Sequence, residues 1–433
     1  MADLSGFEMI ERRTELIKSI ETIVDSHITS EISIDGLEPA LIVRPGTTEE
    51  AAACLKVCAE NNAAVIPAGR MTWLECGNTP RRADVVLSLE RMNRVIEYSP
   101  ADLTATVEAG LTLCELNAIA KGERQWLPLD PPGSQMASLG AIASCNSSGS
   151  LRLGFGTPRD YVLGLRLAHV DGTESKSGGR VVKNVAGYDL NKLYVGSFGT
   201  LAVLTEMTVK LRPLPECSAT VLISSKYRGH LFLLARKLMT SELLPVSVVI
   251  TNHVSAEGEP TPSGDNALLV RFMESETAVK HQVDWMMSAL DENYKGAQLN
   301  DAEADSLWMR VGEWHQQRQT VLRISVPLSE IPKKFEETLQ TPYGCVAVAD
   351  IGTGIIRMAF DGDEEFAAKI INRLRDVVSR VGGSVVIERA SAKVKQMVDV
   401  WGDVGPTAGL MRSVKAKFDP QSILNPGRFV AGI

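Results

Sequence analysis

The apolar and polar positions in the first part of the chain follow the pattern of a β-α-β unit. Residues 41–45 (LIVRP) form a short apolar run that predicts a strand, and 63–69 (AAVIPAG) predict a second strand that ends in a glycine turn. Between them, 49–62 carry small apolar residues at helical spacing, and Thr47 or Thr48 can cap that helix. We therefore expect strand, helix and strand in succession.

The same kind of pattern continues to about residue 215. The run 111–122 predicts a helix, and a proline turn follows at Pro131 and Pro132. The N-terminal residues 1–30 predict a charged amphipathic helix that packs as an arm on the main body. Its partial apolar stripe consists of Ile10, Leu16, Ile17, Ile20 and Ile23. Further short strands are expected at 84–92, 95–100, 104–110, 163–172 and 199–215.

Beyond residue 215 the chain alternates apolar runs of strand length with helical patterns. Helices are predicted at 229–239 and 364–381. Strands are predicted at 220–224, 246–250, 267–273, 322–328, 345–351, 355–360 and 384–389. This alternation predicts a mainly antiparallel sheet covered by helices, and hence an α+β fold class.

These changes of pattern divide the 433 residues into four parts. The turn-rich end, 417–433, is typical of a tail that returns to the first domain. We expect a helical arm at 1–40, a first domain at 41–215, a second domain at 216–410 and a returning C-terminal segment at 411–433.

Composition and charge narrow the class of protein. Hydrophobic residues make up 44% and charged residues 23%, the balance of a globular enzyme. The net charge is -8 and no long basic run is present, so nucleic acid is not an expected partner. The N-terminus has no apolar core of signal-peptide type and no stretch is long enough to span a bilayer, so we expect a cytoplasmic protein without direct membrane insertion.

The cysteines point to neither a disulfide framework nor a metal centre. Seven are scattered along the chain without paired spacing, which suits reduced thiols. Cys54 and Cys58 stand four apart on a helical pattern, where two small core residues are the simpler interpretation. We expect no iron-sulfur cluster in this chain.

Three glycine-bearing runs are candidates for binding a large flat ligand. The run 67–77 follows a strand and can aim backbone N–H groups at a diphosphate, although a plain turn with Gly69 at positive φ also explains it. The run 130–149 is rich in small residues that let the backbone approach a ligand closely. The run 178–215 is the most specific, because polar side chains stand among its glycines. They are Lys183, Asn184, Tyr188, Asp189 and Lys192, beside Gly187, Gly196 and Gly199.

In this order and spacing, the three runs resemble the FAD-binding domain of the vanillyl-alcohol oxidase and p-cresol methylhydroxylase type. The tail, from Phe418-Asp419-Pro420 to Asn425-Pro426-Gly427-Arg428, resembles the closing motif of its 2-hydroxyacid dehydrogenase branch. The phrases VVKNVAGYDL, KLYVGSFGTL and SILNPGR are most similar to the E-subunit family of bacterial glycolate oxidases. The implied fold is a two-part FAD-binding domain with an antiparallel-sheet cap domain covered by helices.

The resemblance also implies which residues hold FAD. The backbone of the 68–72 loop would cradle the pyrophosphate, the 132–144 run would line the flavin, the turn at 199–203 would touch the adenine half, and the tail would return to the isoalloxazine. The residues implied are Ala68, Gly69, Arg70, Met71, Thr72, Pro132, Ser138, Leu139, Gly140, Ser144, Gly199, Thr200, Leu201, Ala202, Val203, Asn425 and Arg428.

The pyrophosphate loop departs from the family pattern at two positions. Arg70 and Met71 stand where family loops usually carry glycine, and Arg70 is a candidate to offer its guanidinium to a phosphate. Thr72 stands at the usual flavin-linking point, where no histidine or cysteine is present. Noncovalent FAD is therefore expected.

The chemistry of substrate oxidation is less visible in the sequence. Active members of the branch present a histidine-rich metal-binding motif in the second domain, whereas the six histidines here are not paired at ligand spacing. No metal site is expected. Arg323 is a candidate contact for a substrate carboxylate, and a local ion pair is an equal alternative. His315 is a candidate to face the flavin, although a lone helical histidine is more often at the surface.

Three functions remain open. The first is an FAD-bearing subunit of a glycolate oxidase complex, with a larger FAD-binding catalytic subunit and an iron-sulfur subunit as partners that also supply any contact with the inner membrane. The second is a stand-alone dehydrogenase of a small 2-hydroxy acid such as D-lactate. The third is a structural subunit that has lost FAD. We rank them in this order.

Overall fold

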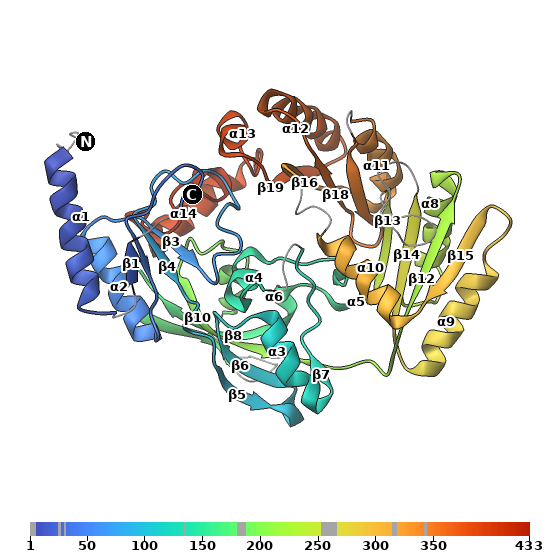
Figure 1. Ribbon diagram of the computed structural model, residues 1–433, viewed down its shortest axis with the longest axis horizontal. Coiled ribbons are helices and arrows are strands. Elements are labelled where there is room, and N and C mark those ends of the chain that lie inside the picture. The colour runs from blue at the N-terminus through green and yellow to red at the C-terminus, as the bar shows by residue number, and fades with distance from the viewer. Residues whose placement is uncertain are drawn as a thin grey trace.

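The computed structural model describes residues 6–24, 27–29, 32–132, 136–179, 188–252, 266–313, 318–341 and 344–433. In these ranges the chain folds into two bodies of sheet and helix, and the crossing between them lies after residue 213 (Figure 1). None of the helices in the described ranges is both long and apolar enough to cross a membrane.

The first sheet has four strands in the order β1-β2-β4-β3. Strands β2 (Leu41–Val43) and β3 (Val65–Ala68) run parallel to β4 (Val85–Ser88), and β1 (His27–Thr29) is an antiparallel edge. The residues of β2 and β4 are all buried, which explains why these strands are continuous apolar runs rather than alternating ones. The expected β-α-β unit is present, with β4 inserted between its two strands.

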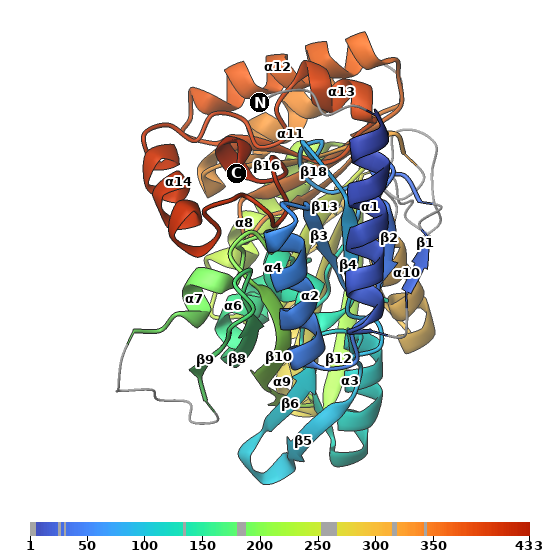
Figure 2. The same ribbon diagram turned by 90° about the vertical axis from the view of Figure 1, so that its left-hand side faces the viewer.

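Two helices cover this sheet. Helix α2 (Thr48–Glu60) begins after Thr47, whose hydroxyl accepts a hydrogen bond from the Glu50 N–H and so satisfies an open backbone donor of the first turn. Cys54 and Cys58 are fully buried in α2, in agreement with their interpretation as core residues. Helix α1 (Gly6–Glu21) lies alongside α2 (Figure 2), and its last turns enter the same core. The expected N-terminal helix is therefore shorter than 1–30.

The second sheet has five antiparallel strands in the order β5-β6-β10-β8-β9. Helices α3 (Leu113–Ala120) and α4 (Leu139–Cys145) pack on it through apolar residues, and both begin at a hydroxyl cap. The strands are β5 (Val95–Ser99), β6 (Thr104–Glu108), β8 (Val162–Ala168), β9 (Glu174–Gly178) and β10 (Val203–Lys210). The remaining short elements of this half are η1 (Pro100–Asp102), η2 (Lys121–Glu123), β7 (Gln125–Trp126), α5 (Arg152–Phe155), α6 (Pro158–Tyr161), α7 (Asn191–Tyr194) and β11 (Arg212–Pro213).

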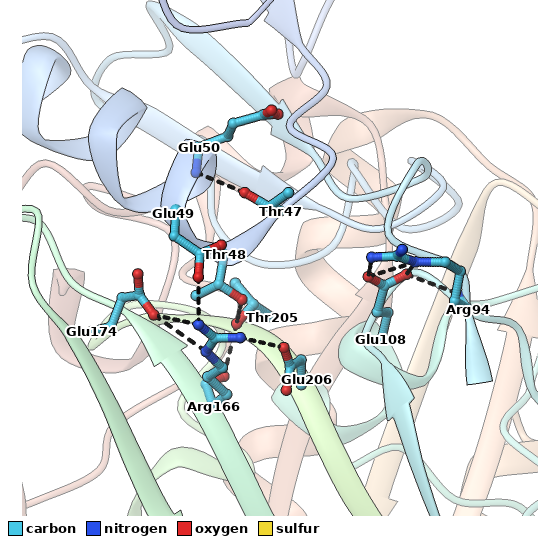
Figure 3. Close-up of polar contacts among 10 residues, drawn as sticks. All are labelled: Thr47, Thr48, Glu49, Glu50, Arg94, Glu108, Arg166, Glu174, Thr205 and Glu206. Carbon is cyan, nitrogen blue, oxygen red and sulfur yellow. Dashed lines mark hydrogen bonds and ion pairs between the residues drawn. The ribbon is translucent and has the colours of Figure 1, made fainter. Parts of the chain in front are cut away.

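Arg166 links the first sheet layer to the second. Arg166 on β8 makes ion pairs of 2.7–2.8 Å with Glu49 at the start of α2, Glu174 on β9 and Glu206 on β10 (Figure 3). The guanidinium offers several donors in a fixed plane, so one side chain can serve three carboxylates. These hydrogen bonds and charges raise the pKa of Arg166, although burial alone would lower it.

The cap sheet has eight strands in the order β15-β12-β14-β13-β17-β18-β16-β19, and every pairing in it is antiparallel. Its strands are β12 (Cys217–Ser225), β13 (Ser247–Thr251), β14 (Ala267–Glu274), β15 (Tyr294–Leu299), β16 (Thr320–Ser325), β17 (Val346–Asp350), β18 (Ile355–Phe360) and β19 (Ser384–Arg389). The mainly antiparallel cap sheet expected from the sequence is confirmed. Strand β15 was not expected, because its residues are mostly exposed and lack an apolar run.

Helices cover the two faces of the cap sheet unequally. Four helices bury the outer face in the largest core of the molecule, and a fifth covers only the β12–β13 end of the inner face (Figure 1). The outer four are α8 (Arg228–Met239), α9 (Glu276–Ser288), α11 (Ile331–Leu339), which follows η3 (Leu328–Glu330), and α12 (Glu364–Ser379). The inner helix is α10 (Asp301–Glu313). The β17–β19 end of the inner face is thereby left to the first body.

The C-terminal segment returns to the first sheet. After α13 (Ala392–Met397), helix α14 (Thr407–Phe418) leads into a stretch whose Leu424 forms a parallel bridge with Val65 of β3. The ring of Phe418 lies edge-on against Tyr194 of α7, 5.8 Å between centroids, and the two helices are neighbours in Figure 2. The chain ends with η4 (Val430–Gly432).

We predict that Arg166→Met lowers the free energy of unfolding by about 1–2 kcal/mol. The loss exceeds that of one exposed ion pair because three carboxylates are left facing one another. Urea unfolding measures it, and the difference should shrink at 1 M salt. Lys176→Met, at an exposed position of the neighbouring strand β9, is the control and should change little. Equal losses in the two variants would contradict the linking role of Arg166.

Candidate functional site

One cavity of the structure lies where β3, α4, the start of β10 and the C-terminal segment meet. It holds about 710 Å³ of empty space, part of it open to solvent. That volume lies within the range of pockets for cofactors and other small ligands. The predicted residues that line it are Ala68, Gly69, Arg70, Met71, Thr72, Ser138, Gly140, Ser144, Gly199, Ala202, Val203, Asn425 and Arg428.

The loop after β3 lines this cavity, and four of its backbone donors have no partner among the described residues. In the described part of the chain, no acceptor receives the N–H groups of Gly69, Arg70, Met71 or Thr72. Unpaired neighbouring N–H groups form a concave site that attracts anions such as a pyrophosphate. Met71 adopts a left-handed φ of 61°, so a non-glycine residue reaches here the backbone conformation for which glycine is usual.

Gly69 is required for a different reason than expected. It does not belong to the residues with positive φ, so the simple interpretation of a positive-φ turn at Gly69 is wrong. A Cβ atom at this position would lie 1.8 Å from Ser138 Oγ, the hydroxyl that caps α4 by accepting from the Ala141 N–H. The loop and the start of α4 thus touch without a side chain between them. Gly140 has the same role against Ala109, because a Cβ atom added at Gly140 would lie 2.8 Å from the Cβ of Ala109.

The guanidinium of Arg70 is bound within the protein. Its Nη2 donates to both carboxylate oxygens of Glu115 at 2.8 and 3.1 Å, and Glu115 also closes the capping box of α3 with Thr112. The hydrogen bonds with Thr112 and the charge of Arg70 hold the pKa of Glu115 below its usual value, against the effect of burial, which raises it. Arg70 also lines the cavity, and its buried Nε has no partner in the described part of the chain, so a contact with a phosphate stays a prediction.

Arg428 holds the loop in place from the C-terminal side. Its Nη2 donates to the carbonyl oxygens of Leu74 and Cys76, and its Nη1 donates to Asn425 Oδ1 at 3.0 Å. Asn425 in turn donates to the Phe198 carbonyl at 2.7 Å. These two tail residues therefore join the loop after β3 to the turn before β10. Arg428 is buried, and its desolvation lowers the pKa of the guanidinium.

Lys415 is a second buried cation in the same segment. Its Nζ donates to the carbonyls of Thr200 and Leu424 at 2.8 and 2.9 Å and to the Asp419 carboxylate at 2.5 Å. Asp419 also accepts from the N–H groups of Ile423 and Leu424. Burial lowers the pKa of Lys415, while Asp419 opposes that shift. The pair thus fixes both the turn at Thr200 and the strand-like stretch at Leu424.

Four predicted cofactor residues lie outside the cavity lining. Leu139 and Leu201 are buried in the apolar core, Thr200 donates its hydroxyl to the Ser197 carbonyl, and Pro132 lies at the edge of the described chain. The cavity also has lining residues that the sequence did not single out, most of them close in the sequence to predicted ones. They are Pro67, Trp73, Leu74, Leu89, Ala109, Ala141, Cys145, Phe198 and Leu204.

Of the two residues predicted to act on the substrate, the structure describes Arg323 but not His315. Arg323 lies on β16, on the inner face of the cap sheet, and its Nε is 4.0 Å from Glu388. His315, like Lys183, Asn184 and Gly187 of the third glycine run, lies outside the described residues.

Arg323 belongs to a charged row that the sequence analysis missed. Arg357 lies directly opposite it on β18 and donates from Nε to Glu388 at 3.1 Å. Arg357 also reaches the first body, where its Nη2 donates to the Ser148 carbonyl at 3.0 Å. Asp350 stands on the neighbouring strand β17. The sequence did contain a sign of this row, because each of these charged residues stands in an otherwise apolar strand, at a position that faces away from the outer core.

Two cysteine thiols at or near the cavity are strongly desolvated. Burial raises the pKa of the Cys145 thiol to about 12 and that of Cys76 to about 11. Both are free thiols and unreactive in this state. In the described part of the chain, no group of three His, Cys, Asp or Glu side chains is arranged to hold a metal ion.

Unpaired loop N–H groups beside a wall of small residues suit a dinucleotide cofactor, and the arrangement is that of an FAD-dependent oxidoreductase. Residues 39–178 match the FAD binding domain, and 235–429 match the C-terminal domain of FAD linked oxidases. The chain belongs to the FAD-linked oxidase family, and FAD is its cofactor.

Relatives of known name support this membership. Glycolate oxidase subunit GlcD of Bacillus subtilis is 27% identical over 432 residues, covering 91% of this chain and 89% of the relative. A D-lactate dehydrogenase of Archaeoglobus fulgidus is 29% identical over 416 residues, covering 91% and 92%. The crystal structure of p-cresol methylhydroxylase with substrate bound superposes with a TM-score of 0.74 at 15% identity, covering 100% of this chain and 98% of that one. The last comparison confirms the expected fold.

We predict that Gly69→Ala abolishes retention of FAD. The added methyl group would collide with Ser138 and push the loop away from α4, which disrupts the donors that face the cavity. The absorbance ratio of flavin to protein after purification measures the loss. Gly122→Ala is the matched control, because its Cβ would meet nothing within 4 Å. Normal flavin content in Gly69→Ala would show that the loop is not in contact with the cofactor.

We further predict that Lys415→Met lowers the free energy of unfolding by about 3–5 kcal/mol, since it leaves the buried Asp419 carboxylate without its counter-ion. FAD affinity should fall as well, because the turn at Thr200 loses its anchor. Chemical unfolding and flavin titration measure the two effects. Lys417→Met changes an exposed lysine of the same helix and should leave both quantities unchanged.

Proposed function

We propose that the protein is the FAD-bearing subunit of a glycolate dehydrogenase complex. In this role it supports oxidation of glycolate to glyoxylate and exchanges electrons with partner subunits. The observation that carries the proposal is the cavity with its row of unpaired loop N–H groups, which suits retention of a flavin dinucleotide. The 27% identity with a protein named as a glycolate oxidase subunit supports the choice of complex.

In this proposal the cofactor lies along the cavity in a fixed direction. The backbone of 68–72 holds the pyrophosphate through the unpaired N–H groups of 69–72, and the small residues of α4 lie against the flavin. Gly199, Ala202 and Val203 contact the adenine half, while Asn425 and Arg428 hold the surrounding loops. The flavin supplies the two-electron acceptor. Since Thr72 offers no nucleophile of the kind that links flavins, the cofactor is held noncovalently.

The charged row of the cap completes the proposed site. Arg323 is our candidate for the substrate carboxylate, because its Nε makes no hydrogen bond with any described residue and Glu388 is closer to Arg357. An arginine is well suited to bind a planar carboxylate through two parallel hydrogen bonds. His315 remains a candidate to face the flavin.

The partners follow from the same proposal. A larger FAD-binding catalytic subunit and an iron-sulfur subunit would complete the complex, and contact with the inner membrane would come through them. The resemblance of the third glycine run and the tail to E subunits of glycolate oxidases is our reason to place this chain beside a separate catalytic subunit. The protein itself would remain in the cytoplasm.

A stand-alone dehydrogenase of a small 2-hydroxy acid such as D-lactate is the second candidate. The 29% identity with an archaeal D-lactate dehydrogenase over nearly the whole chain favours it. A structural subunit without FAD is the least favoured candidate, because four backbone donors would then face an apolar-walled cavity with no acceptor.

We predict that the purified chain carries FAD and co-purifies with a larger flavoprotein and an iron-sulfur subunit when the three are expressed together. Anaerobic mixing of the isolated chain with glycolate should leave its flavin oxidised, whereas glycolate should bleach the flavin of the complex. Bleaching of the isolated chain by D-lactate would instead establish the stand-alone dehydrogenase. A chain that stays colourless after incubation with FAD would refute both proposals.

A further inference from the structure

The inner face of the cap sheet brings three charged side chains together on adjacent strands. Arg357 on β18 and Arg323 on β16 are directly paired across the sheet. Asp350 on β17 is paired with Ile355, two residues before Arg357 on the same strand. Side chains two apart on a strand point to the same face. Asp350, Arg357 and Arg323 are therefore neighbours in one row, which faces the FAD-binding half through the bond from Arg357 to Ser148.

This row carries more positive than negative charge at its arginine end. Two arginines directly opposite each other repel, and Glu388 is the carboxylate between them. Glu388 lies 3.1 Å from Arg357 Nε but 4.0 Å from Arg323 Nε. The charge of Arg152 adds to the field at Arg323, whose pKa is lowered by burial and by these two neighbouring arginines, while Glu388 raises it. An anionic group is therefore favoured beside Arg323.

Asp350, at the other end of the row, supplies a hydrogen-bond acceptor instead of a positive charge. The residue is 5% exposed, and its Oδ1 has no hydrogen-bond partner among the described residues. Burial raises the pKa of Asp350 to about 7, and Asp130 from the first body acts in the same direction, while hydrogen bonds from the Thr353 side chain and the Gly352 backbone and the charge of Arg357 lower it. An oxygen such as Oδ1 that is buried without a donor is unfavourable, so a donor brought by a ligand would be bound there.

We propose that Asp350 accepts a hydrogen bond from the hydroxyl group of the ligand while Arg323 and Arg357 hold its carboxylate. A 2-hydroxy acid presents these two groups on adjacent carbons, so one small molecule can meet both ends of the row. The inference rests on the proposed function, which supplies the class of ligand, and it assigns to Asp350 the recognition of the hydroxyl group.

The same placement assigns a path for the proton when such a ligand is oxidised. Oxidation to the 2-oxo acid breaks one O–H and one C–H bond. Within the complex, the hydroxyl proton would pass to the ionised Asp350 carboxylate, and the bound FAD would take up the hydride with both electrons. Asp350 then returns the proton to solvent. Because only the ionised carboxylate can take the proton, hydroxyl recognition should strengthen as the pH rises through about 7.

The test compares two ligands that differ only in the hydroxyl group, glycolate and acetate. The FAD-loaded protein is first reduced with dithionite, so that no turnover intervenes, and binding is followed by tryptophan fluorescence. We expect the wild type to prefer glycolate on the order of ten-fold or more. Asp350→Leu, of similar volume but without an acceptor, should bind acetate as the wild type does and lose the preference. Asp350→Asn should show a weaker preference that no longer depends on pH.

Two further variants make the result specific. Arg323→Met should weaken glycolate and acetate equally, on the order of ten-fold, because it removes the carboxylate contact that both share. Asp376→Asn, at an exposed position of α12, should leave the preference unchanged. A wild-type preference retained in Asp350→Leu overturns the assignment. If the wild type holds no FAD, or binds neither glycolate nor D-lactate, the proposed function itself fails.

A stability measurement checks the environment of Asp350 without any ligand. Its raised pKa means that the folded chain keeps a proton that the unfolded chain loses above about pH 4. Between about pH 4 and 7 the folded state thus binds more protons, so the group's contribution to stability falls as the pH rises. Asp350→Leu should lack this loss, and its melting temperature relative to the wild type should rise from pH 5 to pH 8. A pH-independent difference would contradict the buried, protonated state.

Discussion

The candidate FAD site depends on two buried cations of the C-terminal segment. Lys415 and Arg428 donate mostly to backbone carbonyls of three separate segments, the loop after β3, the turn before β10 and the returning tail itself. Because these cations bind the carbonyl groups of the loop, its N–H groups remain available for a ligand in the cavity. Burying these charges is unfavourable unless every donor is well placed, so the same interactions that stabilise the site also define its shape.

The cap is attached to this assembly at points close to the cofactor cavity. Lys395 of α13 donates to Asp35 and to the Glu75 carbonyl, and Trp401 donates to the Arg428 carbonyl at 2.9 Å. The charged row on the cap's inner face therefore has a fixed position relative to the loop after β3 that lines the cavity. A site divided between two bodies needs such attachments, because a shift of about 1 Å is enough to misplace a reacting group.

The sequence predicted the parts of the structure that local rules govern. The Thr47 cap, the buried strands of the first sheet and the alternation in the cap follow from patterns within a few residues. The glycine runs located the cavity, because small residues are needed where backbone and ligand approach. Arg70 could not be placed from its own surroundings, since Glu115 meets it only after α3 packs. Strand β15 carries no apolar signal, because it is an exposed edge whose partner β12 supplies the buried side. Asp350 and Arg357 were not predicted, because they come together only through the pairing of their strands and belong to no sequence motif.

The return of the tail also determines when the protein can become a holoenzyme. Arg428 and the carbonyl of Cys76 that it binds are separated by 352 residues. At common rates of synthesis, roughly 20–70 s pass between their appearances. During that time the first body can form its sheets, but its cavity has no closing side. The cavity is therefore completed only after Lys415 and Arg428 have been synthesised and have packed against the first body.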